Sequence, residues 1–440
     1  MESAVMVKKR NRAYWLLIIS SFILYITMTS AKNLYVAEKT TLYTLGTFGN
    51  LTDLAATMEY YFYTYAAAQL FMVLMMKRLN LKWYVTLCLG ASAVITVLMS
   101  FTGNILQHYV LYTVNGFFQA CLWGCQIKVF SLYLPKRLLP AANRVASAGP
   151  AVAGAVAYGI AAAFGDNWRA PFFMMGILLL AIVLLYFFSV TYVSRFPKEI
   201  ETHHVVYADG SEADVSDEEE NDFIHLKSRK RILWFYVISV LIGALVTSLY
   251  FALNNNLDVF LKEIGGLSND AAKWLTVFAP LVAAVGPFIT VYFCERHNNF
   301  ITVGAVHFGA AMLVALLLLL LFELNVILSL ILMILFLTIV NGGRSISLSI
   351  AALRMRQKID SGVYTTLVNV AASIVAGLSP KLVAMILDNQ LLSVADSWHW
   401  SLAMILAWSA LTVVALLVIL FGVKRLNKKD KKTEKIFQKS

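Results

Sequence analysis

The chain has 440 residues, of which 60% are hydrophobic and only 14% are charged, with a formal net charge of +11. A water-soluble fold of this size cannot cover so much apolar surface, so the composition excludes an ordinary soluble enzyme or binding domain. The basic residues stand in short clusters between apolar runs, as a membrane topology requires, and this argues against a nucleic-acid partner.

Twelve apolar runs follow one another along the chain. A helix needs roughly 20 residues to cross a hydrocarbon layer of about 30 Å, and each run approaches or exceeds that length. The runs are continuous and too long for the alternating strands of a barrel, so we predict an all-α membrane protein with twelve transmembrane helices. The predicted spans are 14–36, 52–76, 83–103, 107–133, 143–164, 168–192, 232–260, 271–293, 300–321, 324–350, 361–387 and 397–423.

Lysine and arginine predict the orientation of these spans. The two termini and the connections on their side of the membrane hold 28 of the 36 basic residues. The opposite connections hold only Lys39, Arg169, Lys262 and Lys273. The bias indicates a multi-pass protein of the cell membrane with both termini in the cytoplasm.

A polar segment, residues 194–231, separates the sixth and seventh spans. It contains the run DGSEADVSDEEEND and has almost no apolar content, which is typical of a disordered acidic linker. The segment divides the chain into an N-terminal six-helix half, 1–193, and a C-terminal six-helix half, 232–423. Residues 424–440 form a basic cytoplasmic tail.

The two halves repeat short motifs at similar offsets. Asn115-Gly116 returns as Asn341-Gly342, 226 positions later, and Asp166-Asn167-Trp168 returns as Asp396-Ser397-Trp398, 230 positions later. The two offsets together indicate duplication of a six-span unit. Two parallel six-span units around a site at the membrane midplane are the architecture of transporters that work by alternating access.

Four motifs then resemble one family. They are Lys32-Asn33 in span 1, Asp53-Leu54 with Tyr65 in span 2, NGFFQACLW (115–123) in span 4 and FLKE (260–263) in span 7. With these motifs the chain resembles the organophosphate:phosphate antiporters of the major facilitator superfamily. The resemblance implies the major facilitator fold, with two six-helix halves, and a solute pathway between them.

The chain departs from this family at the residues that bind phosphate esters. Ala31 stands where such members have an arginine before the KN pair. They have a second arginine midway along span 7, but no arginine lies between Leu233 and Lys262 here, and Tyr250 or Leu253 stands at that position. The histidine of span 5 is absent from SAGPAVAGA, and Gln69 replaces a lysine of span 2. The paired-arginine clamp is therefore missing, and phosphate-ester transport does not carry over from the resemblance.

Ionisable side chains inside the spans are candidate site residues, because each is costly in hydrocarbon unless it faces a cavity or a partner. Arg344 lies ten residues, or about 15 Å, from Arg354 near the end of its helix, which places it near the midplane. Its planar guanidinium suits a carboxylate or phosphate, although a structural ion pair would also explain it. Lys32 and Lys128 are further candidates for binding. For Lys381, gating or snorkelling is expected rather than binding.

Glu59 is predicted to be the one carboxylate deep in a span of the N-terminal half. It is a candidate to carry a coupling proton or to neutralise Lys32. Three consecutive amides, Asn254, Asn255 and Asn256, predict a local unwinding of span 7 with at least one side chain on the pore. The remaining uncharged candidates for substrate binding are Tyr63, Tyr65, Gln69, Gln119, Tyr250 and Asn369.

Motifs of other function classes are absent: the sequence has no Walker A loop, no HExxH, no GxSxG and no metal-ligand spacing. We expect no enzyme activity, no cofactor and no bound metal. The expected function is a secondary transporter that moves a small polar solute, with an anion favoured, by rocker-switch alternating access.

Several points stay open at this stage. The coupling ion is a proton or phosphate, and the chain is expected to act as a monomer in the lipid bilayer. Two alternatives are a transporter-like sensor or receptor for such a solute, and a lipid or drug exporter with a wider, more apolar cavity.

Overall fold

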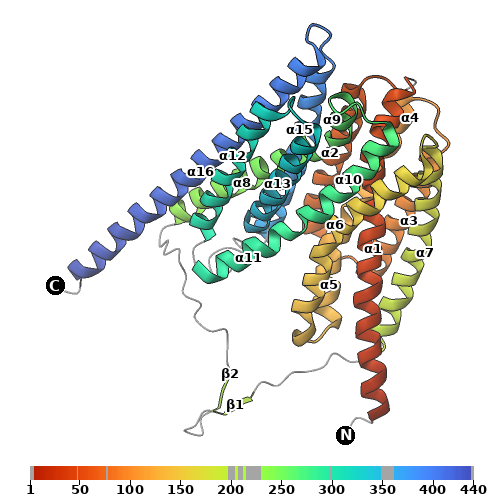
Figure 1. Ribbon diagram of the computed structural model, residues 1–440. Coiled ribbons are helices and arrows are strands. Elements are labelled where there is room, and N and C mark those ends of the chain that lie inside the picture. The colour runs from red at the N-terminus through yellow and green to blue at the C-terminus, as the bar shows by residue number, and fades with distance from the viewer. Residues whose placement is uncertain are drawn as a thin grey trace.

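The computed structural model describes residues 4–46, 48–75, 78–196, 204–206, 212–214, 229–297, 300–347 and 361–437. Nearly all of them are helical, and Figure 1 shows the helices packed as one bundle with both termini toward the same end. Two three-residue strands are the other regular elements of the described residues. The predicted all-α class is confirmed.

The first half contains one helical rod for each of the first six predicted spans. Span 4 is built from α4 and α5, and Ala120 between them keeps helical dihedrals (φ −62°, ψ −22°). Asn104 accepts a hydrogen bond from the Gln107 N–H at 3.0 Å and so caps the start of α4. The elements are α1 (Ala4–Thr44), α2 (Leu51–Met75), α3 (Leu81–Met99), α4 (Ile105–Gln119), α5 (Cys121–Tyr133), the 3₁₀ turn η1 (Lys136–Leu138), α6 (Leu139–Phe164) and α7 (Arg169–Val193).

The second half repeats the pattern with two interruptions. Span 7 is divided at Asn255 and Asn256, as the run of three amides predicted, and span 8 is divided at Ala284. Ser268 caps α10 and Asn325 caps α13 through their side-chain oxygens. The elements are α8 (Arg229–Asn254), α9 (Leu257–Glu263), α10 (Asn269–Ala283), α11 (Val285–His297), α12 (Phe300–Leu321), α13 (Val326–Ser345), α15 (Ser361–Leu387) and α16 (Val394–Phe437).

Nine helices of the described residues are long and apolar enough to cross a membrane on length and composition alone. Three further helical rods do not meet this criterion of length and composition, each for a physical reason. The α4–α5 rod is interrupted, α6 contributes a shorter apolar stretch at Val152–Phe164, and α2 carries Glu59 and a run of tyrosines. These polar residues on α2 are themselves a sign of function, since they are costly in hydrocarbon.

The structure differs from the predicted segment boundaries in three places. α1 continues to Thr44, eight residues past the predicted end of span 1, and α16 continues to Phe437, through most of the predicted tail. Within the predicted disordered linker, β1 (His204–Val206) pairs antiparallel with β2 (Glu212–Asp214). The rest of residues 197–228 lies outside the described residues.

Two separate apolar cores underlie the two halves. One consists of buried residues of α1–α7 with Ala376 of α15, and the other of buried residues of α8–α16 with Leu51 and Ala55 of α2. We call α1–α7 the first half and α8–α16 the second half. Because each core includes residues from the other half, α2 and α15 pack across the boundary between the halves.

The halves meet closely at one end of the bundle. This end, where α1 ends and α2 begins, lies opposite both termini, and we call it the far end (Figure 1). Asp388, just after α15, accepts hydrogen bonds from the Thr52 N–H and Thr52 hydroxyl, both at 2.6 Å, and so caps α2 across the boundary. Toward the other end, Figure 1 shows the helices of the two halves diverging.

Candidate functional site

Two cations from opposite halves lie on either side of an aromatic pair. Lys32 Nζ of α1 lies 5.6 Å from the ring centroid of Phe62 on α2, and the Arg344 guanidinium of α13 lies 5.4 Å from the ring of Phe251 on α8. Phe62 and Phe251 contact each other edge to face with centroids 5.4 Å apart. The two cations are also close enough for their charges to repel. They therefore belong to one site that spans the boundary between the halves.

Arg344 is held by aromatic rings and one amide. Its guanidinium lies 4.7 Å from the ring centroid of Tyr250, in addition to the Phe251 contact, and donates a 3.3 Å hydrogen bond to Asn341 Oδ1. Its Nε is buried and has no hydrogen-bond partner among the described residues. A buried donor without a partner is costly, so this arrangement leaves Arg344 capable of binding an anion.

Within the described residues, neither Lys32 nor Arg344 lies within ion-pair distance of a carboxylate. The alternative interpretation of Arg344 as half of a structural ion pair therefore finds no partner in the described part of the chain. Tyr250, at the span 7 position where the resembled family has an arginine, lies against Arg344, whereas Leu253 is buried in the second core.

Glycines on α13 allow it to pack tightly behind Arg344. A Cβ at Gly343 would lie 2.1 Å from the Phe308 ring of α12, and one at Gly342 would lie 2.3 Å from Thr290 of α11. The close approach of these helices fixes the face of α13 that carries Arg344.

Tyr25 and Trp123 add a second aromatic wall near Arg344. Their ring centroids are 5.5 Å apart, and the Tyr25 hydroxyl is close enough to Arg344 to interact with its charge. Tyr25 reaches this position across α6 at Gly149, where a Cβ would lie 2.4 Å from the tyrosine ring. The sequence interpretation missed Tyr25 because a single tyrosine in an apolar run carries no distinctive signal.

Glu59 has a different partner from the one expected. Its Oε2 forms an ion pair with Lys381 Nζ of α15 at 2.7 Å, and its Oε1 accepts a 2.5 Å hydrogen bond from the Tyr63 hydroxyl. The predicted neutralisation of Lys32 by Glu59 is therefore wrong in this conformation. Instead, Glu59 joins α2 to α15 across the boundary, and a role of Lys381 in gating stays a prediction.

Gln119 lies inside the packing of the first half. It is fully buried, accepts a 2.6 Å hydrogen bond from the Tyr61 hydroxyl and donates at 2.9 Å to Ser92, whose hydroxyl in turn donates to Asn115. This network satisfies the side chain without a solute. Four further candidates are half-buried on their helices: Tyr65 and Gln69 on α2, Lys128 on α5 and Asn369 on α15.

The three amides of span 7 lie where the helix is broken. Asn254 Nδ2 donates to Asn255 Oδ1 at 3.2 Å, and Asn256 Nδ2 donates back to the Ala252 carbonyl at 2.8 Å. Asn255 and Asn256 are almost completely buried, and both accept hydrogen bonds from Lys39 of α1. The break therefore contacts the first half at the far end.

Two lysines that the sequence interpretation placed in loops are in fact buried in helices. Lys39 is 1% exposed in α1, and Lys273 is 0% exposed in α10. Lys273 forms an ion pair at 2.8 Å with Glu38, which is also 0% exposed, so Glu59 is not the one deep carboxylate of the first half. For Glu38 and Lys39 the error arose because α1 continues to Thr44, beyond the most apolar part of its sequence.

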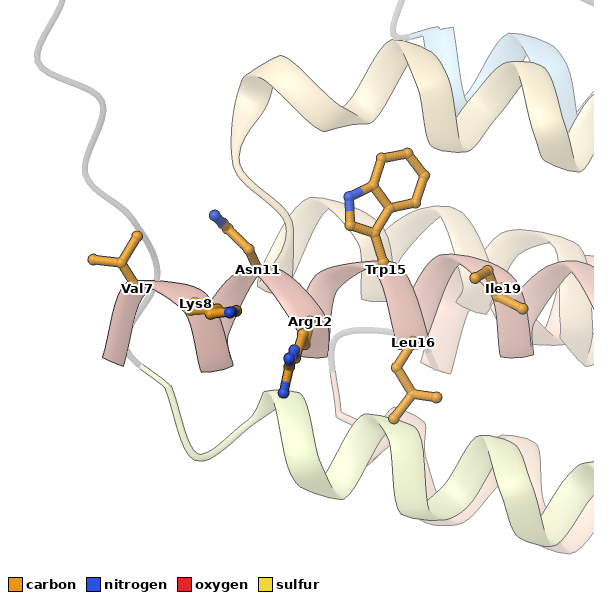
Figure 2. A pocket seen from close by; sticks show the side chains of 7 residues that line it. All are labelled: Val7, Lys8, Asn11, Arg12, Trp15, Leu16 and Ile19. Atoms are coloured by element: carbon orange, nitrogen blue, oxygen red, sulfur yellow. The ribbon is translucent and has the colours of Figure 1, made fainter. Parts of the chain in front are cut away.

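An open groove of about 630 Å³ lies along the N-terminal part of α1 (Figure 2). It is lined by Val7, Lys8, Asn11, Arg12, Trp15, Leu16 and Ile19, all from α1. Solute sites bring polar groups from several elements together, and this groove does not. Basic residues beside an exposed tryptophan are typical of a helix at the membrane–water interface.

The described residues contain no group of three or more histidine, cysteine, aspartate or glutamate side chains that could hold a metal ion. The four cysteines, Cys88, Cys121, Cys125 and Cys294, are buried, and none forms a disulfide bond within the described residues.

Two helical halves around cations without carboxylate partners are the arrangement of a solute transporter. A family model described as Major Facilitator Superfamily matches residues 13–380. The chain belongs to this superfamily and is a multi-pass membrane transporter, not an enzyme.

Solved structures support the same fold over nearly the whole chain. A bacterial homologue of the human lysosomal transporter Spinster, in an inward-facing and unoccupied conformation, is 13% identical over 96% of this chain and 98% of that chain, with a TM-score of 0.71. The nucleoside transporter NupG is 13% identical over 93% and 99%, with a TM-score of 0.64. A D-xylose–proton symporter is 11% identical over 92% and 96%, with a TM-score of 0.68. No curated protein matches the chain.

Proposed function

We propose that this protein is a secondary transporter that moves a small organic anion by alternating access, with Lys32 and Arg344 as the residues that bind its charge. The observation that carries the proposal is the position of these two cations, which come from opposite halves and lie on one site. Since each cation belongs to a different half, an anion that binds both draws the halves together. Binding energy is thereby linked to the conformational change.

The charge balance of the central region favours an anion over a neutral or cationic solute. Glu59 is already paired with Lys381, so its negative charge is compensated within the protein. Lys32 and Arg344 remain without carboxylate partners in the described residues, and a bound anion would relieve their mutual repulsion.

The aromatic surroundings distinguish this site from a phosphate-ester clamp. The four motifs support a divergent member of the organophosphate:phosphate antiporter family, but Ala31 and Tyr250 replace the paired arginines. Rings of Tyr250 and Phe251 lie beside Arg344 instead, and the Tyr25 hydroxyl is close enough to interact with its charge. A solute with one anionic group and an organic body fits such a lining better than inorganic phosphate.

The closed far end supports an inward-facing conformation. The clustering of basic residues favours a cell-membrane protein with both termini in the cytoplasm, and in that orientation the far end faces outward. The pathway lies between the two halves of one chain, and a monomer is therefore sufficient.

Ligand-induced thermal stabilisation of the detergent-purified protein tests the proposal. The panel contains carboxylates, phosphate esters, inorganic phosphate, sugars, amino acids and nucleosides. We expect an organic anion to raise the unfolding temperature of the wild type and of Arg296→Gln, and to have no effect on Arg344→Gln. Arg296 is a matched control because it is exposed and, among the described residues, bonds Tyr292 of its own helix α11.

Uptake into proteoliposomes then distinguishes transport from sensing. Uptake of the stabilising anion that is lost in Arg344→Gln supports the transporter. Binding without uptake favours the sensor, and stabilisation by neutral or cationic solutes alone overturns the anion assignment.

A further inference from the structure

The break in span 7 contains a group of buried oxygen atoms that already holds a positive charge. α8 ends at Asn254 and α9 begins at Leu257. The break leaves the Asn255 carbonyl free, because the helix that would have supplied its hydrogen-bond donor is interrupted. Lys39 fills this position: its ammonium donates to the Asn255 carbonyl and, at 2.6 Å, to Asn256 Oδ1.

Asp258, two residues after Asn256, adds a buried carboxylate to the break. Its side chain is 0% exposed, and its Oδ2 accepts a hydrogen bond from the Thr40 hydroxyl. Its Oδ1 is buried and accepts no hydrogen bond in the described part of the chain. The carboxylate is also close enough to Lys39 to attract its charge. The Asn255 carbonyl and the Asn256 amide oxygen therefore bind the buried ammonium group, and the Asp258 carboxylate, bonded to Thr40, lies two residues further along the same break.

These ligands are suited to a hard metal cation as well as to an ammonium. Carboxylate, carbonyl and hydroxyl oxygens are the usual ligands of such cations. The negative end of the dipole of α8, a helix of 26 residues, adds to the attraction. Unwound carbonyls at the end of a half-helix are a known type of sodium site in transporters of other folds.

Lys39 belongs to the first half, whereas Asn255, Asn256 and Asp258 belong to the second. If the far end opens, α1 withdraws the ammonium and leaves a buried carboxylate without its counter-charge. Such a loss is strongly unfavourable unless another cation takes the place.

We propose that the oxygens of Asn255, Asn256 and Asp258 form a binding site for a monovalent metal cation, with Na⁺ as the test ion, which Lys39 occupies while the far end is closed. Metal cation and Lys39 compete for one site, so the cation favours the open far end and acts as the coupling ion. This coupling rests on the proposed alternating access, but the binding of the cation does not.

The test uses Lys39→Ala, in which the site loses its tethered cation. Unfolding temperatures are measured in NaCl, KCl, LiCl and choline chloride at equal ionic strength. We expect a saturable rise with a metal cation for Lys39→Ala, and none beyond the choline response for the wild type. The effect should be lost in Lys39→Ala/Asp258→Asn.

Lys262→Ala is the matched control, because Lys262 lies on α9 and bonds Thr44 across the same boundary, and no hydrogen bond among the described residues joins it to the oxygens of the break. It should respond like the wild type. An equal response of Lys39→Ala to choline, or a response that persists without Asp258, overturns the proposal.

Binding of ²²Na⁺ to Lys39→Gln is a second measurement that keeps more of the local packing. Saturable binding that Asp258→Asn removes supports the site, and absence of binding contradicts it. Neither result depends on the solute, so failure of the cation site and failure of the anion transporter are distinguishable.

Discussion

Gly377 on α15 lies against the backbone of Glu59 on α2, so closely that a Cβ at position 377 would lie 2.8 Å from the Glu59 Cα. Gly154 on α6 lies against the side chain of Pro280 on α10, where a Cβ would lie 3.0 Å from the proline Cβ. The two glycines are 223 positions apart, and the residues that they contact are 221 apart. The two contacts between the halves are therefore related by the internal repeat, which the sequence motifs alone indicated only weakly.

Gly377→Ala is expected to loosen the far end. The added methyl group meets backbone rather than a mobile side chain, so α2 and α15 must separate, at a cost of about 1–3 kcal/mol. A cysteine at Thr41, which is 1% exposed in the closed conformation, should then react several-fold faster with a membrane-impermeant maleimide. Gly309→Ala is the control, because a Cβ at Gly309 has no neighbour within 4 Å. Equal rates in the two variants would show that the close contact does not hold the far end closed.

The ion pair between Glu59 and Lys381 should act together with this contact. Glu59→Gln and Lys381→Gln each leave one charge without its partner, and each should speed labelling at position 41. The double variant should be less affected than the sum of the two single variants, with a coupling energy of about 0.5–3 kcal/mol. A double-mutant cycle on labelling rates measures this quantity. Simple additivity would contradict a direct role of the pair in closure.

The buried pair between Glu38 and Lys273 allows a test of stability. Lys273→Met leaves a carboxylate buried without a counter-charge, which costs about 3–5 kcal/mol. Glu38→Gln/Lys273→Met removes both charges and should recover most of the loss. Unfolding of the purified protein in detergent measures both effects, with Lys262→Met as the control at the less buried lysine of α9. If the double variant is as unstable as Lys273→Met, then packing of the lysine stem, not charge, governs the site.

The sequence predicted the parts of this structure that depend on composition over long windows. Twelve spans, the break at Asn255 and the midplane cations followed from apolar runs and from the cost of polar groups in hydrocarbon. The twelve-helix fold and the break are confirmed. The roles of Lys32 and Arg344 in binding remain predictions.

The partners of charged residues could not be predicted, because they depend on contacts between distant parts of the chain. Glu59 and Lys381 are 322 positions apart, and Lys39 and Asn256 are 217 apart. Lys39 and Lys273 were placed in loops since they lie at the polar ends of apolar runs, where a buried and an exposed lysine look alike in sequence. Tyr25 likewise became a candidate only through its position beside Arg344.

Gly149→Ala tests whether Tyr25 shapes the central site. A Cβ at position 149 would lie 2.4 Å from Tyr25 Cδ1, so the ring must shift by about an ångström and weaken its contact with Trp123. The helix itself should remain intact, because alanine is a better helix former than glycine. A shift of this size in a binding group can reduce affinity about tenfold, equivalent to about 1.4 kcal/mol. We expect a matching loss for the anion found in the thermal screen, measured by titration of the stabilisation.

Gly159→Ala lies on the same helix with no atom within 4 Å of its Cβ and should bind like the wild type. If Gly149→Ala also binds like the wild type, Tyr25 is only part of the packing, and Tyr250 and Phe251 alone form the aromatic lining around Arg344.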